Sequence, residues 1–431
     1  MSRPLILLVP KTSYREADLL AAAERLGVPT VLASDRCHVL AEDWPAGAIP
    51  LDFTQPVEAA RALADSVRAR EPLAVMGVDE VTSVIAAHTA RELHLPHNPI
   101  DAVETARDKG RFRAALERAG LPRPWSRLAP RELPADELKA LALTLAFPCV
   151  LKPLTLSGSR GVIRADDPAS FTRAFERVGR LLRSPAVAAR RDPRHTDVLI
   201  EEFLPGAEVA LEGLLHDGAL QVLALFDKPD PLDGPFFEET LYVTPSRHPL
   251  ALQQAIAQAT QAAVQALGLL DGPVHAELRL TPRGPIVIEL AARSIGGLCG
   301  RTLRFGLGVT LEELVLRHAL GRTRPAASPS APEPLLRDQT ASGVLMLPIR
   351  KGGILREVRG LEPARAVPHI EDIVITAHLD EELVPLPEGA SYLGFAFARA
   401  STPAEVERAL RQAWSQLEVH VTPKLDLAAP R

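Results

Sequence analysis

The chain of 431 residues and 46.5 kDa is about three times as long as a ~150-residue domain, which excludes a single small module and favours two to four domains. Its composition, 46% hydrophobic and 24% charged, excludes a mainly disordered protein. The 49 basic and 54 acidic residues give a net charge of −5, so we expect no nucleic-acid partner.

The apolar segments of the sequence are too short to span a membrane. The run at residues 5–9 has the length of a strand and lacks the features of a signal peptide. Elsewhere no run of about 18 apolar residues occurs, so we expect no membrane partner. The three cysteines, Cys37, Cys149 and Cys299, are far apart and too few for a disulfide framework. Both observations predict a cytoplasmic protein.

Residues 4–99 alternate between apolar runs and amphipathic stretches. In chain order, a strand is expected at 5–9, a helix at 16–26, a strand at 30–32, a helix at 56–68, a strand at 73–76 and a helix at 81–93. This order predicts a parallel sheet with helices on its faces. The first strand is not followed by GxGxxG, so we expect a Rossmann-like scaffold without a dinucleotide site.

After a helix expected at residues 108–119, the pattern changes to antiparallel-looking strands with few helices. Strands are expected at 149–152, 161–164, 198–203, 209–215, 220–226, 275–280 and 285–290, and helices at 168–182 and 250–267. A Pro/Ala/Ser-rich stretch at 322–334 indicates a linker. Beyond it, strands are expected at 342–348, 372–377 and 394–400, before a last helix that opens with a capping box of Thr402 and Glu405.

Lysine is scarce in this chain, which makes each lysine informative. Only seven of the 49 basic residues are lysine. One of them, Lys152, ends an apolar strand, and a loop of small residues at 157–161 follows. The N–H groups of such a loop, together with a lysine at a strand end, can bind phosphate oxygens. An ordinary hairpin loop with an exposed lysine explains the pattern equally well, and no Walker motif is present.

Two glutamates lie on the two arms of an expected hairpin. If Leu280 pairs with Ile286 across a five-residue loop, Glu277 stands directly opposite Glu289. Two carboxylates at roughly 5 Å require a cation or a proton between them, and hard oxygen donors suit Mg²⁺ bound to nucleotide phosphates. A four-residue loop would instead send the two acids to opposite faces, so the sequence leaves both arrangements open.

An arginine follows the second glutamate by four residues. This residue, Arg293, precedes the glycines Gly296 and Gly297. A guanidinium at this place can clamp a phosphoryl group or a carboxylate in bidentate fashion. A salt bridge to one of the two glutamates is an equally good interpretation.

In this order, the lysine loop, the paired glutamates and the arginine resemble an ATP-grasp ligase, and the resemblance extends over nearly the whole chain. It implies a mixed α/β and α+β architecture: a Rossmann-like pre-ATP-grasp domain at residues 1–105, an ATP-grasp domain at 106–325 with a lid subdomain at about 145–205, and a C-terminal α+β domain at 335–431. The segment 392–400 is similar to the C-terminal domain of the L-amino acid ligase and biotin carboxylase-like branches.

The resemblance also implies roles for individual residues. For ATP it implies Lys109 and Lys152 at the phosphates, the lid residues Ser157, Gly158, Ser159 and Gly161, and Glu201, Phe203, Leu204 and Glu208 around adenine and ribose. It implies Glu277 and Glu289 as metal ligands, with Arg293 and Lys152 as catalytic residues. The family often has asparagine two residues after the second metal ligand, where this chain has Ala291, whose side chain offers no ligand.

Substrate residues follow from their position in the expected fold. Glu80 follows the third strand, where open α/β sheets bind ligands, although a solvated helix start is an equally good interpretation. His275 faces the metal pocket only if its strand is regular. Arg293, Gly296, Gly297 and Leu298 complete the expected substrate residues. The segment 227–239 is either a loop that covers substrate or a plain surface turn.

These observations predict an ATP-dependent carboxylate–amine ligase. We expect a cytoplasmic enzyme that makes an amide from an amino acid or a small carboxylic acid through an acyl phosphate, releasing ADP and phosphate. The expected cofactors are ATP and Mg²⁺, with Mn²⁺ as an alternative metal, and the expected partners are small-molecule substrates and a second copy in a homodimer. Two alternatives stay open: a biotin carboxylase-like enzyme that uses bicarbonate, and an inactive ATP-binding regulatory protein.

Overall fold

The computed structural model describes residues 3–35, 48–306, 308–321 and 340–424. The expected linker at 322–334 lies outside these residues. The chain forms two compact units. The first unit contains Met1–Arg123, Val209–Leu225 and His248–Gln339, and the second contains Pro124–Glu208, Phe226–Arg247 and Thr340–Arg431. Because each unit is built from three stretches of chain, we describe each by itself.

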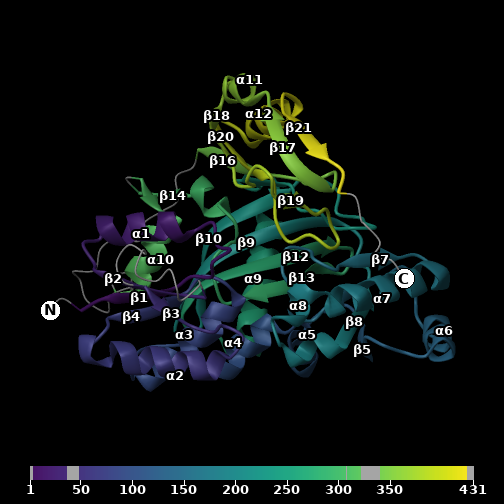
Figure 1. Cartoon of the computed structure of the whole chain (residues 1–431), viewed down its shortest axis with the longest axis horizontal. Coiled ribbons are helices and arrows are strands. Elements are labelled where there is room, and N and C mark those ends of the chain that lie inside the picture. Colours follow the sequence, from purple (N-terminus) through teal and green to yellow (C-terminus); the bar gives the residue numbers. More distant parts are fainter. Residues whose placement is uncertain (1–2, 36–47, 307, 322–339, 425–431) are drawn as a thin grey trace. The chain divides into compact units, whose positions relative to one another are not determined.

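A parallel sheet in the order β3-β2-β1-β4 opens the first unit (Figure 1). Its strands are β1 (Leu5–Leu8), β2 (Thr30–Ser34), β3 (Ile49–Pro50) and β4 (Ala74–Gly77). Alternate side chains of β1 point to opposite faces, so Leu5 and Leu7 pack with α1 (Glu16–Arg25) and α10 (Leu311–Ala319), while Ile6 and Leu8 pack with α2 (Pro56–Val67) and α3 (Glu80–Glu92). The predicted Rossmann-like scaffold is confirmed.

The rest of the first unit is an antiparallel sheet covered by helices. Its strand order is β13-β12-β9-β10, with β9 (Ala207–His216), β10 (Ala219–Lys228), β12 (Gly272–Thr281) and β13 (Gly284–Ala291). Three helices belong to this part, namely α4 (Ile100–Arg107), α5 (Lys109–Arg118) and α9 (Leu250–Leu267). Phe112 and Leu116 of α5 share one apolar core with Val264 of α9 and Leu278 of β12. This core fixes α5 next to the sheet.

The hairpin of β12 and β13 combines a short turn with a bulge. Leu280 pairs with Pro285 with four residues between them, which is the shorter of the two loops that the sequence left open. Glu277 nevertheless pairs with Glu289, because a β-bulge at Ile288 adds one residue to β13 and moves the register back by one. The bulge therefore restores the pairing that the shorter turn would have broken.

In the second unit, a four-stranded sheet packs against two helices. The strand order is β5-β8-β6-β7, with β5 (Ser126–Pro130), β6 (Cys149–Pro153), β7 (Ile163–Ala165) and β8 (Asp197–Glu202). The helices are α6 (Ala135–Leu143) and α7 (Pro168–Arg183), and the short α8 (Pro185–Ala188) follows. The core between sheet and helices contains Leu151, Phe171 and Phe175, all at most 2% exposed.

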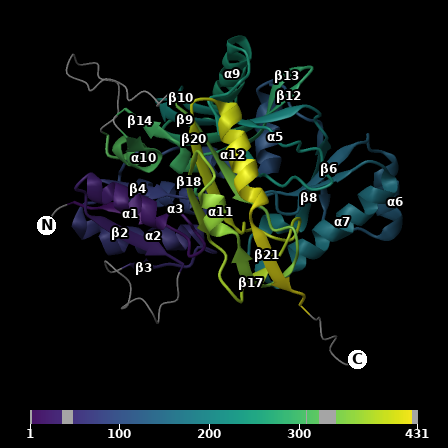
Figure 2. The same cartoon turned by 90° about the horizontal axis from the view of Figure 1, so that it is seen from above.

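The C-terminal strands of this unit continue the sheet that contains β10. Next to the end of β10 lie β11 (Leu241–Thr244), β16 (Ala341–Leu347), β20 (Gly394–Ala400) and β18 (Ile370–Ile375), in that order. The helices α11 (Leu361–Arg365) and α12 (Pro403–Ser415) pack against this sheet, as Figure 2 shows, and the predicted capping box of Thr402 and Glu405 is present. A small sheet of β19 (Glu382–Leu383), β17 (Gly353–Arg359) and β21 (Glu418–Thr422) completes the unit.

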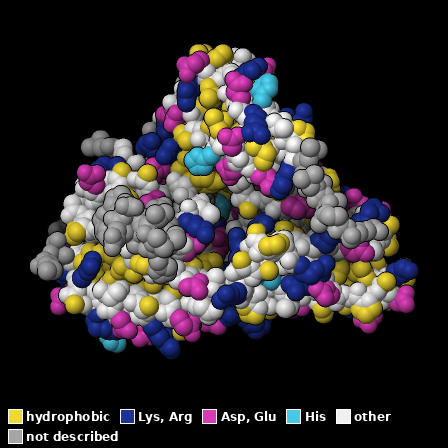
Figure 3. Space-filling model, viewed as in Figure 1, with side chains coloured by type: hydrophobic (Ala, Val, Ile, Leu, Met, Phe, Trp, Pro, Cys, Tyr) yellow, Lys and Arg dark blue, Asp and Glu magenta, His cyan; other side chains and the backbone are white. Residues whose placement is uncertain are grey.

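The surface carries charges of both signs. On the face drawn in Figure 3, acidic and basic side chains are interspersed and do not gather in one patch of a single sign. Among the described helices, none combines the length and apolar character that crossing a bilayer requires.

We expect Phe171→Ala to destabilise this sheet and its helices by about 3–5 kcal/mol, because the buried Phe171 ring lies 5.9 Å from the ring of Phe175 and truncation leaves a cavity. Hydrogen exchange of the β6 and β8 amides measures the change. The control is Leu128→Ala, whose side chain is 52% exposed. Equal protection in the two variants would contradict the role of Phe171.

Candidate functional site

Two carboxylates face each other in the first unit. Glu277 of β12 and Glu289 of β13 form a direct cross-strand pair, at a position where Cβ atoms lie about 5 Å apart. The Glu277 side chain is 17% exposed and that of Glu289 is 32% exposed, so both carboxylates are only partly solvated. Two such charges stay ionised together only when cations share them.

A lysine at the start of α5 supplies one of these cations. The Lys109 ammonium lies 3.4 Å from the Glu289 carboxylate, and the Lys109 side chain is only 9% exposed. Asp108 caps α5, since its carboxylate accepts the N–H groups of Gly110 and Arg111. The cap fixes where the helix begins and thereby the place of Lys109.

The bulge in β13 is held by an arginine of the same helix. The Arg113 guanidinium is 2% exposed and donates to the Ile288 carbonyl at 2.7 Å. A bulge releases a carbonyl from the regular ladder, and a charged donor satisfies it at low cost. Arg113 thus stabilises the irregularity that sets Glu289 opposite Glu277.

His275 lies between Glu277, one of the two expected metal ligands, and a second glutamate that is more deeply buried. Its ring lies 3.6 Å from Glu277 and 3.1 Å from Glu212 of β9, which is fully buried. Burial alone would lower the pKa of His275, but hydrogen bonds to Glu212 and Glu277 outweigh it and raise the pKa to about 9. Glu212 also accepts the Ile295 N–H at 3.0 Å, which ties the loop after β13 to the sheet. The sequence did not single out Glu212.

In the first unit, Arg293 and Glu80 form an ion pair. The Arg293 Nε donates to Glu80 at 3.0 Å, and Nη2 contacts the same oxygen. The salt bridge to Glu277 or Glu289, which the sequence left open, is therefore replaced by one to Glu80. The Glu80 side chain is 18% exposed, so it is no solvated helix start. Burial would raise the pKa of Glu80, but the guanidinium holds it below its ordinary value.

Around Arg293, the loop is pinned from several elements. Arg15 donates to the Ser294 hydroxyl at 2.8 Å and lies 3.5 Å from Glu312. Gly297 has φ +59°, a conformation that favours glycine, and Leu298 is 4% exposed. These contacts hold Gly296, Gly297 and Leu298 in a fixed turn next to Arg293.

The second unit contains two buried lysines, each paired with glutamate. Lys152 at the end of β6 lies 2.5 Å from Glu201 of the neighbouring strand β8, and their side chains are 10% and 4% exposed. The exposed lysine of an ordinary hairpin is therefore ruled out for Lys152.

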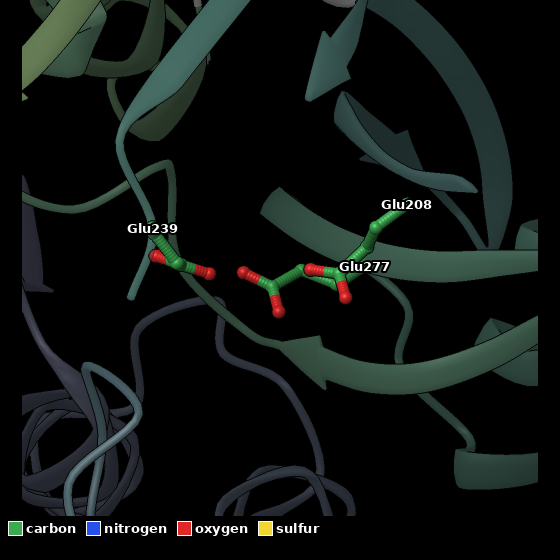
Figure 4. Close-up of side chains that lie close together, drawn as sticks. All are labelled: Glu208, Glu239 and Glu277. Atoms are coloured by element: carbon green, nitrogen blue, oxygen red, sulfur yellow. The ribbon is translucent and has the colours of Figure 1, made fainter. Parts of the chain in front are cut away.

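Lys228 was missed as a site residue. Its ammonium lies 2.6 Å from Glu208 and 2.7 Å from Glu239, and 4.7 Å from the centre of the Tyr242 ring. Figure 4 shows the Glu208 and Glu239 carboxylates, together with Glu277 of the first unit. Lys228 is the last residue of β10 and is 6% exposed, so this part of the segment 227–239 is neither a loop nor a surface turn. The scarcity of lysine in this chain is the sequence signal that could have pointed to Lys228.

Near Lys152, the second unit carries an apolar cluster. Phe203 packs with Val150, Leu232 and Phe237, and Leu204 is 4% exposed. The Arg164 guanidinium covers the Phe203 ring at 4.2 Å. This apolar cluster and the buried Glu201 carboxylate are the kinds of group that small-molecule sites combine.

The loop at residues 157–161 connects β6 to β7. Three of its residues have positive φ: Gly158 (+64°), Ser159 (+55°) and Gly161 (+75°). Successive N–H groups in such a turn can face one ligand, but in this loop the N–H groups of Arg160 and Gly161 donate to the Ser157 and Pro387 carbonyls. A Cβ at Gly161 would lie 2.8 Å from Pro153 and 2.9 Å from Leu181, so only glycine fits there.

The sequence-predicted residues thus fall into two groups, one in each unit. The first unit brings together Glu80, Lys109, His275, Glu277, Glu289, Arg293, Gly296, Gly297 and Leu298. The second unit contains Lys152, Ser157, Gly158, Ser159, Gly161, Glu201, Phe203, Leu204 and Glu208.

The donor set of the first group fits a hard divalent cation. Glu277 and Glu289 offer carboxylate oxygens from a rigid hairpin, which is the ligand type that Mg²⁺ prefers. Ala291 pairs with His275 and offers no donor, so the two glutamates are the protein ligands that the hairpin can supply.

Comparison with known proteins gives a consistent assignment. Three family models match: the ATP-grasp N-terminal domain at residues 20–97, the ATP-grasp domain at 145–302, and the L-amino acid ligase C-terminal domain 2 at 345–422. Together they cover more than half of the chain. The chain belongs to the ATP-grasp family. A crystal structure of an L-amino acid ligase from Bacillus licheniformis superposes with TM-score 0.81 and 26% identity, over 98% of this chain and 99% of that one.

Curated relatives match over shorter stretches. Alanine--anticapsin ligase of Bacillus subtilis is 29% identical over 246 residues, 53% of this chain and 50% of the relative. Dapdiamide A synthase of Enterobacter agglomerans is 33% identical over 168 residues, 38% of this chain and 37% of the relative. This ATP-grasp chain therefore matches half or less of the length of these relatives.

We expect Cys149 to resist alkylation in the folded protein. The thiol is fully buried, and burial, with a smaller contribution from Asp166, raises its pKa to about 12, so about one thiol in 10⁴ is ionised at pH 8. Iodoacetamide labelling read by peptide mass spectrometry measures this, with protein unfolded in guanidinium as the fully labelled control. Labelling of native Cys149 at the rate of a free thiol would contradict the prediction.

Proposed function

We propose that the chain is an ATP-dependent carboxylate–amine ligase. The observation that carries the proposal is the direct opposition of Glu277 and Glu289 on a hairpin, with Lys109 held 3.4 Å from one of them. In this proposal ATP phosphorylates a carboxylate, ADP leaves, and an amine displaces phosphate from the acyl phosphate to form an amide. Membership of the ATP-grasp family and the likeness to an L-amino acid ligase support amino acids or small carboxylic acids as substrates.

Each group of residues has a part in the proposal. Lys109 and Lys152 bind the phosphates of ATP. Lys152 and Arg293 are the catalytic residues, because both contact the phosphoryl group that is transferred and stabilise its charge. The loop of Ser157, Gly158, Ser159 and Gly161 covers the nucleotide and excludes water from the acyl phosphate. Glu201, Phe203 and Leu204 bind adenine, and Glu208 binds ribose.

Glu277 and Glu289 hold Mg²⁺, with Mn²⁺ as an alternative. When bound, the metal ion neutralises phosphate charge. Glu80, His275, Arg293, Gly296, Gly297 and Leu298 line the substrate site, where Glu80 is suited to a substrate amino group. The domain limits of 1–105, 106–325 and 335–431, the homodimer and the cytoplasmic location stay predictions.

The test is nucleotide turnover with pools of amino acids and small carboxylic acids, with ADP and AMP separated. We expect Mg²⁺-dependent ADP and phosphate only with particular acid and amine pools, and abolition by chelator. Glu289→Ala should lower the rate by about 100-fold or more, because it removes a metal ligand and the partner of Lys109. The control is Glu137→Gln, on the exposed first turn of α6.

The products decide between the candidate functions. AMP in place of ADP would exclude the acyl phosphate mechanism. ADP formation that depends on bicarbonate and needs no amine would favour the biotin carboxylase-like alternative. Tight ATP binding without turnover in any pool would favour the inactive regulatory protein.

Arg293→Lys should lower kcat by about 10- to 100-fold, because lysine keeps the charge but loses the planar fork that contacts Glu80 and the phosphoryl group. Steady-state kinetics measure the change. Arg301→Lys is the matched control, since Arg301 forms a two-point pair with Asp18 in the same unit at 2.8 and 2.9 Å. An equal loss in both variants would show a structural effect and contradict the role of Arg293.

A further inference from the structure

A loop of the C-terminal region contacts the lid loop within the second unit. We call residues 384–392 the latch loop and residues 157–161 the lid loop. The Gly161 N–H donates to the Pro387 carbonyl at 2.8 Å, and Arg160 Nε donates to the Glu388 carbonyl at 2.8 Å. Two consecutive residues of the lid loop are therefore hydrogen-bonded to two consecutive residues of the latch loop.

A side-chain pair reinforces these main-chain contacts. The Glu388 carboxylate accepts from Arg177 of α7 at 2.6 and 2.8 Å, in a bidentate arrangement that fixes orientation as well as distance. The Arg177 guanidinium also lies 5.0 Å from the centre of the Phe236 ring. Hydrogen bonding from Arg177 holds the pKa of Glu388 below its ordinary value, so the Glu388 carboxylate stays ionised in this pair.

The lid loop has little freedom at the end that the latch loop contacts. Gly161 is wedged against Pro153 and Leu181, with no space for a Cβ. Ser157 and Gly158, at the other end, are exposed. Movement of the lid loop away from the latch loop therefore has to break the hydrogen bonds of Arg160 and Gly161 at the fixed end.

We propose that the latch loop positions the lid loop, and that the Arg177–Glu388 pair sets how often the lid loop opens. This inference rests on the proposed function only in assigning the lid loop to ATP. Glu388 is a positioning residue: it acts on nucleotide through Arg177, Arg160 and the lid loop. The C-terminal region thereby takes part in nucleotide retention without supplying a group to the reaction.

The test is limited trypsin digestion of the full chain at the bond between Arg160 and Gly161. Cleavage requires Arg160 to leave the latch loop, so Glu388→Lys, which repels Arg177, should speed it by about 2- to 5-fold, the range for a half-exposed ion pair. Arg177→Glu with Glu388→Arg should return the rate toward that of the parent. Glu388→Gln, which keeps the shape, should give a smaller increase.

The matched control is Glu371→Lys. Glu371 pairs with Arg399 at 2.9 Å in the same unit, and its side chain is 41% exposed, as is that of Glu388. An unchanged cleavage rate in Glu388→Lys and Glu388→Gln, or an equal increase in Glu371→Lys, would overturn the proposal.

Kinetics give a second readout that a merely structural role would not move. Glu388→Lys should raise KM for ATP by about 2- to 5-fold with a smaller change in kcat, because the closed lid loop is less populated. Digestion does not depend on catalytic turnover, so the role of the latch loop and the ligase activity are tested independently. If cleavage changes in the Glu388 variants but no pool gives ADP, the role of the latch loop is supported and the ligase proposal is rejected. If the enzyme makes an amide but cleavage does not change in the Glu388 variants, the ligase proposal is supported and the role of the latch loop is rejected.

Discussion

Repulsion between two carboxylates is the constraint on which the first unit depends. Glu277 and Glu289 are held opposite each other, and the surrounding cations compensate them: Lys109 contacts Glu289, and His275 lies next to Glu277. A bulge in the hairpin sets the register that places the two glutamates opposite each other. The hydrogen bond from Arg113 to the Ile288 carbonyl stabilises this bulge. Helix α5 therefore supplies both the cation that shares the charge and the donor that stabilises the backbone irregularity. In the proposed function, this arrangement is preorganised for a divalent cation and phosphate.

Glutamates neutralise the buried lysines throughout the chain. Lys109, Lys152 and Lys228 are each at most 8% exposed and each lies within 3.4 Å of a glutamate. Leaving an ammonium group buried without a partner would cost several kcal/mol, so these pairs maintain the site without ligand. Phosphate oxygens arriving at the lysines would compete with carboxylates that already hold them in place. These three are the buried ones among the seven lysines of the chain, and the other four are exposed.

The sequence was sufficient for the long elements, whereas the roles of the candidate residues stay predictions. The helix predicted at 250–267 and the strand at 394–400 have the predicted limits, because long periodic patterns are decided locally. The bulge of the β12–β13 hairpin was not predictable, since it is held by Arg113, which is distant in sequence. Glu212 and Lys228 were missed because strand residues become site residues only through partners on other strands. Short elements such as β5 and β21 were missed because tertiary pairing, not propensity, forms them.

The interleaving of the two units restricts how this chain can be recombined with a relative. Strand β11 lies between β10 and β16, and its Leu241 and Val243 are buried in the core of the C-terminal sheet. In a chimaera that replaced only the region after residue 340, β11 of this chain would have to pack into the core of another protein. The edge of β11 would then pair with a strand that did not evolve with it. Segment 226–247 therefore has to travel with the C-terminal region. In this chain, a border drawn from the linear sequence alone would therefore divide a packed core.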